Sequence, residues 1–174
     1  MSSCTVHIAE TAYQGDALSL YNTLMPSPYM LLLEGAEIET KSNTQSLLIS
    51  HSCVRIFTTG ATAVSAVALT PNGRAVLDTL QQKLGDFVRH HTPDKLDFEF
   101  PVVDTGLAEH IRVKQPNVLS VLRCLKDAYQ DIFMGGVFGF DLLECAEDLP
   151  SVPMGNNDCP NFVIYIAEDR KSVV

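Results

Sequence analysis

Basic side chains are scarce in this sequence of 174 residues. It has 12 lysines and arginines against 21 aspartates and glutamates, which leaves a formal net charge of -9. A chain with this charge is repelled at long range by a phosphate backbone or an anionic lipid surface. The composition therefore argues against nucleic acid and membrane partners.

Long apolar runs, targeting signals and paired cysteines are also missing. The longest apolar stretches are short, whereas a membrane-spanning helix needs about 20 residues. The start, MSSCTVHIAE, has neither the basic residues nor the apolar stretch of a secretory signal peptide. The five cysteines form no C-x-x-C pair and have no histidine at zinc-finger distance. These absences predict a soluble cytoplasmic protein with reduced thiols and no metal site.

The remaining composition is that of a folded domain. Hydrophobic residues make up 46% of the chain and charged residues 19%, which excludes the signature of intrinsic disorder. A chain of this length can bury a sizeable core, and it contains no internal repeat. We therefore expect a single domain over residues 1–174.

The hydrophobic pattern predicts an α+β fold with a largely antiparallel sheet and packed helices. Helices are expected to begin after Asp16, at Thr70 with Pro71, and at Pro116, and to end near residues 25, 84 and 129. Strands are expected at 29–33, 46–49, 53–58, 63–69, 96–100, 135–140 and 162–167. Sequential strands joined this closely are antiparallel, because a parallel return needs a dozen or more residues. The polar stretch 89–95 is expected to be a surface loop.

Two short motifs are similar to known catalytic or ligand-binding motifs, but we interpret both as having a structural role. The Asp-Thr-Gly triplet at 104–106 resembles that of aspartic proteases, but it has no second copy, and these residue types are common in turns. Gly135, Gly136 and Gly139 match neither phosphate-binding glycine pattern. Glycines within a strand indicate a bulge or a close approach of another backbone, and we favour that reading.

Histidine and cysteine positions give no catalytic constellation. His90 and His91 are adjacent, so their side chains diverge in a strand or a helix and do not jointly hold one metal ion. We interpret them as solvated surface residues. A nucleophile at Cys145 or Cys159 would need a partner base that the spacing does not identify.

Glu34 is the most informative single carboxylate. It follows an apolar strand and precedes a glycine, so it is an exposed acceptor on a rigid support, suited to the ammonium group of a small ligand. The alternative is a charge at a sheet edge that discourages aggregation. On these residues alone the alternative is favoured.

Two segments, however, resemble a known family. Residues 31–40 read LLLEGAEIET and residues 133–150 read FMGGVFGFDLLECAEDLP, followed by Asn157, Cys159 and Pro160. In order and spacing they resemble the N-terminal region of the anthranilate synthase large subunit (component I), a chorismate-utilising enzyme family. The resemblance covers nearly the whole chain. It implies the N-terminal part of that α+β fold and a lyase that converts chorismate, with ammonia or glutamine, to anthranilate and pyruvate in tryptophan biosynthesis.

The resemblance also implies what this chain lacks. In that family the chorismate-binding catalytic domain lies downstream, so no catalytic residue and no cofactor is assigned here, and Mg2+ belongs to the parent enzyme. The expected partners are a glutamine amidotransferase subunit and the missing chorismate-binding half. The chain is therefore expected to be truncated and inactive alone.

The family's LLLES segment lines the pocket where tryptophan binds and inhibits the enzyme. The resemblance thus makes Leu33, Glu34, Gly35 and Gln45 the candidate effector-binding residues. The family's serine is Gly35 here and its usual lysine falls at Gln45, so a hydroxyl and a cation are lost and weaker tryptophan binding is expected.

Three alternatives stay open at this point. The chain is a free-standing amino-acid-binding regulatory module, the N-terminal region of an aminodeoxychorismate synthase, or a gene remnant, as its ending IAEDRKSVV suggests. The pattern LLLE-x-AEI at residues 31–38 favours anthranilate synthase over aminodeoxychorismate synthase.

Overall fold

The structure, a computed structural model, describes residues 5, 7–10, 12, 15–24, 27–34, 46–104, 106–112, 114–129, 131–145 and 159–173. The strands are β1 (Leu31–Leu33), β2 (Ser46–Thr58), β3 (Ala63–Ala68), β4 (Val88–Thr92), β5 (Lys95–Glu99), β6 (Met134–Phe138) and β7 (Phe162–Val173). The helices are α1 (Ala17–Thr23), α2 (Pro71–Leu84), α3 (Glu109–Arg112) and α4 (Ser120–Ala128), with short 3-10 turns η1 (Gly85–Phe87) and η2 (Phe140–Cys145).

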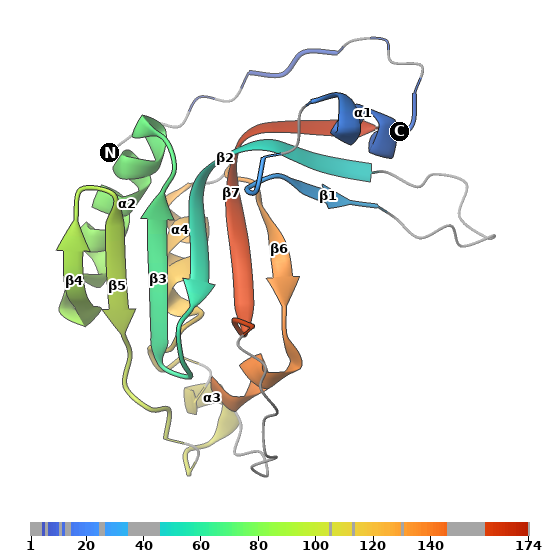
Figure 1. Cartoon of the computed structure of the whole chain (residues 1–174). Coiled ribbons are helices and arrows are strands. Elements are labelled where there is room, and N and C mark those ends of the chain that lie inside the picture. Colours follow the sequence, from blue (N-terminus) through green and yellow to red (C-terminus); the bar gives the residue numbers. More distant parts are fainter. Residues whose placement is uncertain are drawn as a thin grey trace.

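The seven strands form one antiparallel sheet (Figure 1). Its order is β4-β5-β3-β2-β7-β6, and β1 pairs with β2 beside this path. Helices α2 and α4 lie behind the sheet in the view of Figure 1 and cover one of its faces. The expected α+β class with a largely antiparallel sheet is confirmed.

Local signals placed two helix starts correctly. The Asp16 side chain accepts a hydrogen bond from the Ser19 N–H, and the Thr70 hydroxyl accepts one from the Gly73 N–H. The third helix begins later than Pro116, at Ser120, because a turn comes first: the Asn117 side chain accepts from the Leu119 N–H. None of the described helices is long and apolar enough to cross a membrane.

The two strands expected at 46–49 and 53–58 are one strand, β2. The prediction of two strands joined across Ser50 to Ser52 was wrong, because these residues form a bulged bend within one strand, in which the register against β7 shifts. Their buried hydroxyls are paired: Ser52 Oγ donates to the Tyr29 carbonyl at 2.6 Å, and Ser50 Oγ donates to the Asp169 carbonyl at 3.3 Å. The bend lets one strand serve two parts of the sheet.

The expectation of a surface loop at 89–95 was also wrong, since residues 88–92 form strand β4. It pairs with β5 in an antiparallel ladder at the edge of the sheet. Polar, charged side chains are typical of an edge strand, where they discourage pairing with other chains. Similarly, β7 extends beyond the expected 162–167 to Val173, because its polar end pairs with the first half of β2.

The core lies between the sheet and the helices α2 and α4. It is formed by alternate strand residues and by the inward faces of the helices: Val54, Ile56, Val64, Ala66, Leu96, Phe98, Ile164 and Ile166 against Val76, Leu77, Leu80, Val121 and Leu125. Helix α2 approaches the sheet closely at Gly73, where a Cβ would lie 2.0 Å from the Cys53 carbonyl oxygen. The helices therefore exclude solvent from one face of the sheet, and the core residues on that face are buried.

Candidate functional site

The candidate site lies on a small projection of the sheet, which we call the β1 lobe. It consists of α1, β1, residues 46–51 of β2 and residues 169–173 of β7. In the lobe β2 lies between β1 and β7, and α1 packs against β1 and β2 (Figure 1). The bulged bend in β2 turns the lobe away from the rest of the sheet, which we call the main sheet.

Two of the four predicted effector residues lie at the end of β1. Leu33 pairs with Leu47 and is half-buried, and Glu34 follows it with an exposed side chain. Gly35 and Gln45 lie outside the described residues. Leu33 and Glu34 are therefore adjacent at the end of β1, with an apolar side chain followed by an exposed carboxylate.

The two segments that carry the family resemblance meet in space. A Cβ added to Gly135 on β6 would lie 3.2 Å from Ile49 Cδ1, 3.3 Å from Leu31 Cδ2 and 3.4 Å from Phe133 Cε1. The Arg170 guanidinium lies over the Phe133 ring, 4.7 Å from the ring centroid. These residues form an inner corner between the β1 lobe and the main sheet.

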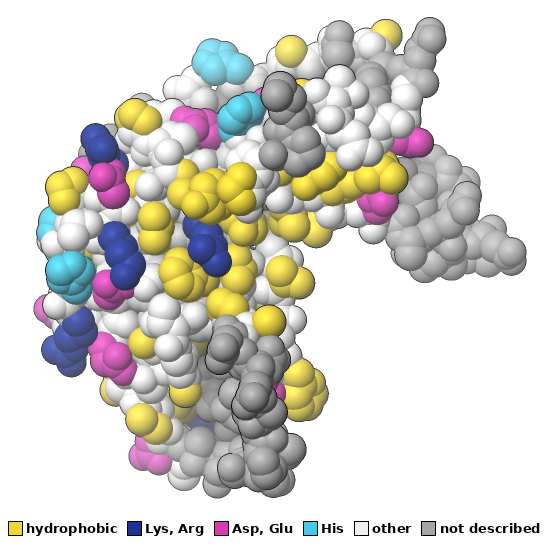
Figure 2. Space-filling model, in the orientation of Figure 1, with side chains coloured by type: hydrophobic (Ala, Val, Ile, Leu, Met, Phe, Trp, Pro, Cys, Tyr) yellow, Lys and Arg dark blue, Asp and Glu magenta, His cyan; other side chains and the backbone are white. Residues whose placement is uncertain are grey.

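An apolar strip runs from this corner to Glu34. Leu31 and Leu33 share one face of β1 because strand side chains alternate, and their cross-strand partners Ile49 and Leu47 share it with them. Figure 2 shows apolar side chains along the lower side of the projecting lobe, above a hollow in the molecule. A strip that ends in a carboxylate can hold a ligand with an apolar body and an ammonium group.

A small cluster of charged side chains lies on β7 and β2 at the bend. Lys171 Nζ lies 2.6 Å from Asp169 Oδ2, and His51 Nδ1 lies 3.9 Å from the same oxygen. Partial burial alone would raise the pKa of Asp169, but hydrogen bonding from Lys171 and Ser50, with the charges of Lys171 and His51, leaves it below its usual value. Lys171 lies on the same strand as Asp169, so the contact of this carboxylate with β2 is the longer one with His51.

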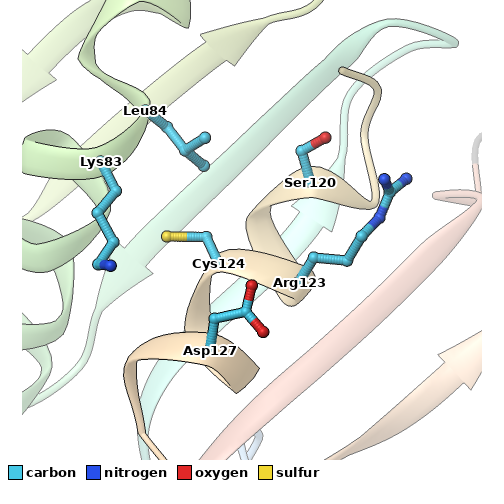
Figure 3. Close-up of a pocket in the computed structure, with 6 residues that line it drawn as sticks. All are labelled: Lys83, Leu84, Ser120, Arg123, Cys124 and Asp127. Atoms are coloured by element: carbon cyan, nitrogen blue, oxygen red, sulfur yellow. The ribbon is translucent and has the colours of Figure 1, made fainter. Parts of the chain in front are cut away.

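A second recess, of about 400 Å³, lies between α2 and α4 (Figure 3). Lys83 and Leu84 line it from α2, opposite Ser120, Arg123, Cys124 and Asp127 of α4. Burial raises the pKa of the Cys124 thiol above its ordinary value. A raised pKa keeps the thiol protonated at neutral pH, which makes it a poor nucleophile.

The remaining sequence motifs behave as structural elements. Asp104 Oδ1 accepts a hydrogen bond from the Gly106 N–H at 3.0 Å, which confirms a turn. Gly136 lies against the backbone of β7, since a Cβ there would be 2.0 Å from the Val163 carbonyl oxygen. His90 and His91 are exposed on β4, and no group of three metal-ligating side chains gathers among the described residues.

Sequence reasoning missed the corner residues Leu31, Ile49 and Phe133. Their contact depends on pairing between distant strands, which no local pattern reports. The signal that could have found them is Gly135 on β6, because a glycine within a strand indicates that another group approaches closely.

Comparison with known proteins gives one consistent group of relatives. No family model matches the chain. It is 37% identical to anthranilate synthase component 1 of Serratia marcescens, 36% to that of Escherichia coli and 35% to that of Vibrio parahaemolyticus. These alignments cover 91%, 91% and 92% of this chain but 32%, 32% and 31% of the relatives. The chain spans about a third of their length, in the N-terminal part.

Proposed function

We propose that this chain, which corresponds in sequence to the N-terminal third of anthranilate synthase component 1, forms the amino-acid-binding feedback region of that enzyme. The observation that carries the proposal is the apolar strip on β1 that ends at Glu34 and meets β6 at Gly135. This strip brings together the two segments that resemble the family, residues 31–40 and 133–150, where Leu31 meets Gly135. Tryptophan, with an apolar ring and an ammonium group, has the matching chemistry.

The proposed ligand lies with its ring on the apolar strip and its ammonium group at Glu34. An ionised acceptor strengthens such a hydrogen bond, and a rigid strand end keeps it in place. Gly35 and Gln45 supply neither a hydroxyl nor a cation. Each lost hydrogen bond forfeits on the order of 1 kcal/mol, or about tenfold to thirtyfold in affinity together.

The parent reaction is part of the same proposal. In it, chorismate and ammonia or glutamine give anthranilate and pyruvate in the cytoplasm, with Mg2+ and a glutamine amidotransferase subunit. The name of the relatives, component 1, supports a partner component. The described residues do not fit a Mg2+ site, because no three acidic, histidine or cysteine side chains gather among them. The proposal places that ion, and the chorismate site, in the part of the relatives that this chain does not span.

Titration with tryptophan tests the effector site. The experiment uses the chain joined to the remaining part of the Serratia marcescens relative and measures affinity by calorimetry and inhibition of anthranilate formation. Replacing Gly35 by Ser and Gln45 by Lys should strengthen binding, whereas Glu34→Gln should weaken it at least tenfold. Glu109→Gln, an exposed carboxylate on α3, is the matched control and should change nothing.

Each result separates one alternative. Unchanged affinity in Glu34→Gln would leave Glu34 as a charged sheet edge and reject the site. Tight tryptophan binding by the chain alone, without association with the remaining part, would instead indicate a free-standing regulatory module. Anthranilate fluorescence produced from chorismate and ammonium by the chain alone would refute the proposed inactivity.

A further inference from the structure

Arg170 on β7 places a cation on the same surface as the apolar strip. It pairs with Ile49 of β2, and Ile49 pairs in turn with Leu31 of β1. Directly paired residues share a face of a sheet, so Arg170 projects from the same face of the β1 lobe as Leu31 and Leu33. The proposed effector surface therefore has a carboxylate at one end of the strip and a guanidinium beside the other end.

No acidic side chain among the described residues pairs with Arg170. Its chain neighbours Asp169 and Lys171 project from the opposite face, where Lys171 Nζ lies 2.6 Å from the Asp169 carboxylate. The exposed Arg170 side chain makes no hydrogen bond or ion pair with any residue that the structure describes. Its guanidinium instead lies over the Phe133 ring, 4.7 Å from the ring centroid. A guanidinium is planar, so its second plane is left open to a ligand.

Packing at the inner corner positions this cation. Phe133 is half-buried, and its Cε1 atom lies 3.4 Å from the point that a Cβ on Gly135 would occupy. Leu31 Cδ2 and Ile49 Cδ1 lie 3.3 Å and 3.2 Å from the same point. The quadrupole of the Phe133 ring attracts the guanidinium and holds it over the ring face. The ring that supports Arg170 thus belongs to the cluster at which the apolar strip ends.

The length of the strip decides which part of an amino acid reaches Arg170. Leu31, in the same row as Arg170, precedes Glu34 by three residues, which is about 10 Å of extended strand. The ammonium and carboxylate groups of an amino acid are bonded to one carbon atom. A ligand with its ammonium group at Glu34 therefore keeps its carboxylate at that end too, and its side chain extends along the strip towards the guanidinium.

A guanidinium beside such a side chain favours an electron-rich aromatic ring. Resting on the proposed function, we propose that Arg170 contacts the ring of the bound amino acid and selects an indole over an aliphatic or electron-poor side chain. The guanidinium then lies between two rings, that of Phe133 and that of the ligand. Indole is the strongest partner of a cation among the natural aromatic side chains. Arg170 is thus a specificity-determining residue, and Phe133 is the residue that positions it.

Fluorinated tryptophans test this contact, because fluorine withdraws electron density from the ring and weakens its attraction for a cation. The chain joined to the remaining part of the Serratia marcescens relative is titrated by calorimetry with tryptophan and with its monofluorinated and tetrafluorinated forms. In the wild type, the affinity should fall as fluorine is added. Arg170→Met should bind tryptophan about fivefold more weakly and should lose the dependence on fluorination.

Two further variants separate the charge of Arg170 from its packing. Arg170→Lys keeps a cation over Phe133 and should keep the dependence on fluorination. Arg89→Met removes an exposed guanidinium from the edge strand β4 and should change neither the affinity nor its dependence on fluorination. The thermal unfolding of every variant is compared with the wild type, so that a loss of folding is distinguished from a loss of the contact.

The outcomes distinguish this inference from the proposed function. A dependence on fluorination that is present in the wild type and Arg170→Lys and absent in folded Arg170→Met supports the contact. Equal dependence in the wild type and Arg170→Met overturns the contact, and the proposed function stands if Glu34→Gln still weakens tryptophan binding. An affinity for tryptophan that neither Glu34→Gln nor Arg170→Met changes, or no binding by the wild type, overturns both.

Discussion

The Cδ2 atom of Leu31 lies 3.3 Å from the point that a Cβ on Gly135 would occupy. The first residue of β1 and the glycine pair of β6 are far apart in sequence, so this contact joins the β1 lobe to the main sheet. It lies at the start of β1, the strand that Glu34 follows. The candidate site therefore depends on the space left by a glycine on another strand.

A larger side chain at Gly135 should move β1. Gly135→Val places methyl groups against Leu31, Ile49 and Phe133, and overpacking of this kind costs about 1–3 kcal/mol. We expect a lower thermal unfolding temperature and weaker binding of any ligand at Glu34. Gly135→Ala should cost less, because the three atoms it meets are ends of side chains at 3.2 to 3.4 Å. Equal effects of the two substitutions would contradict this account.

Gly136 should tolerate no side chain at all. A Cβ there would lie 2.0 Å from the Val163 carbonyl oxygen and 2.8 Å from Ile164 Cα, which are backbone atoms of the paired strand. Gly136→Ala should lower the free energy of unfolding by about 2 kcal/mol or more, measured by urea denaturation. Gly85→Ala is the control, since nothing lies within 4 Å of its Cβ and its backbone is right-handed helical. That control should be neutral or slightly stabilising.

Asp97 should contribute stability that is lost in acid. Partial burial raises its pKa, but hydrogen bonds from Lys95 and Ser65, with the charges of Lys95 and His90, outweigh it and leave the pKa below the ordinary value. Because the pKa is lower in the folded state, the stabilisation is present above the unfolded pKa of about 3.9 and disappears as the pH falls through the folded value. The difference in unfolding free energy between wild type and Asp97→Asn should therefore shrink below about pH 4.

Ser65→Ala removes one of the two hydrogen bonds to Asp97 and provides the check on that cause. It should leave a smaller acid-dependent loss than the wild type shows, while the Lys95 contact of 2.8 Å remains. An acid titration curve identical in wild type, Asp97→Asn and Ser65→Ala would show that other groups control acid unfolding.

The thiols should differ in reactivity according to burial. Cys159 is exposed, whereas Cys53 and Cys124 are buried and burial raises the pKa of Cys124. Since the thiolate is the reactive form, brief treatment with iodoacetamide should modify Cys159 well before the other two. Peptide mass spectrometry measures each rate, and denaturant should abolish the difference. Rapid modification of Cys124 in the folded protein would contradict the packing of α4 on α2.

Local sequence determined the elements whose signals need only near neighbours. The caps at Asp16 and Thr70 were predicted from side-chain chemistry, and alternation predicted the half-buried strand around Leu96 and Phe98. Gly136 was correctly interpreted as a close approach of another backbone. For the candidate site, the same kind of signal predicted a carboxylate, Glu34, at the end of an apolar strand.

Tertiary structure decided the features that depend on pairing between distant strands. Ser50 to Ser52 were expected to separate two strands, but the carbonyls of Asp169 and Tyr29 accept hydrogen bonds from both serine hydroxyls, and these residues form a bulge inside one strand. Residues 88–92 read as a loop, but hydrogen bonds to β5 make them a strand. The contact of Leu31 with Gly135 likewise arises from the register of β1 against β2, β2 against β7 and β7 against β6. Periodicity reports which face of an element is apolar, whereas the partner that covers this face is fixed only when the whole chain has folded.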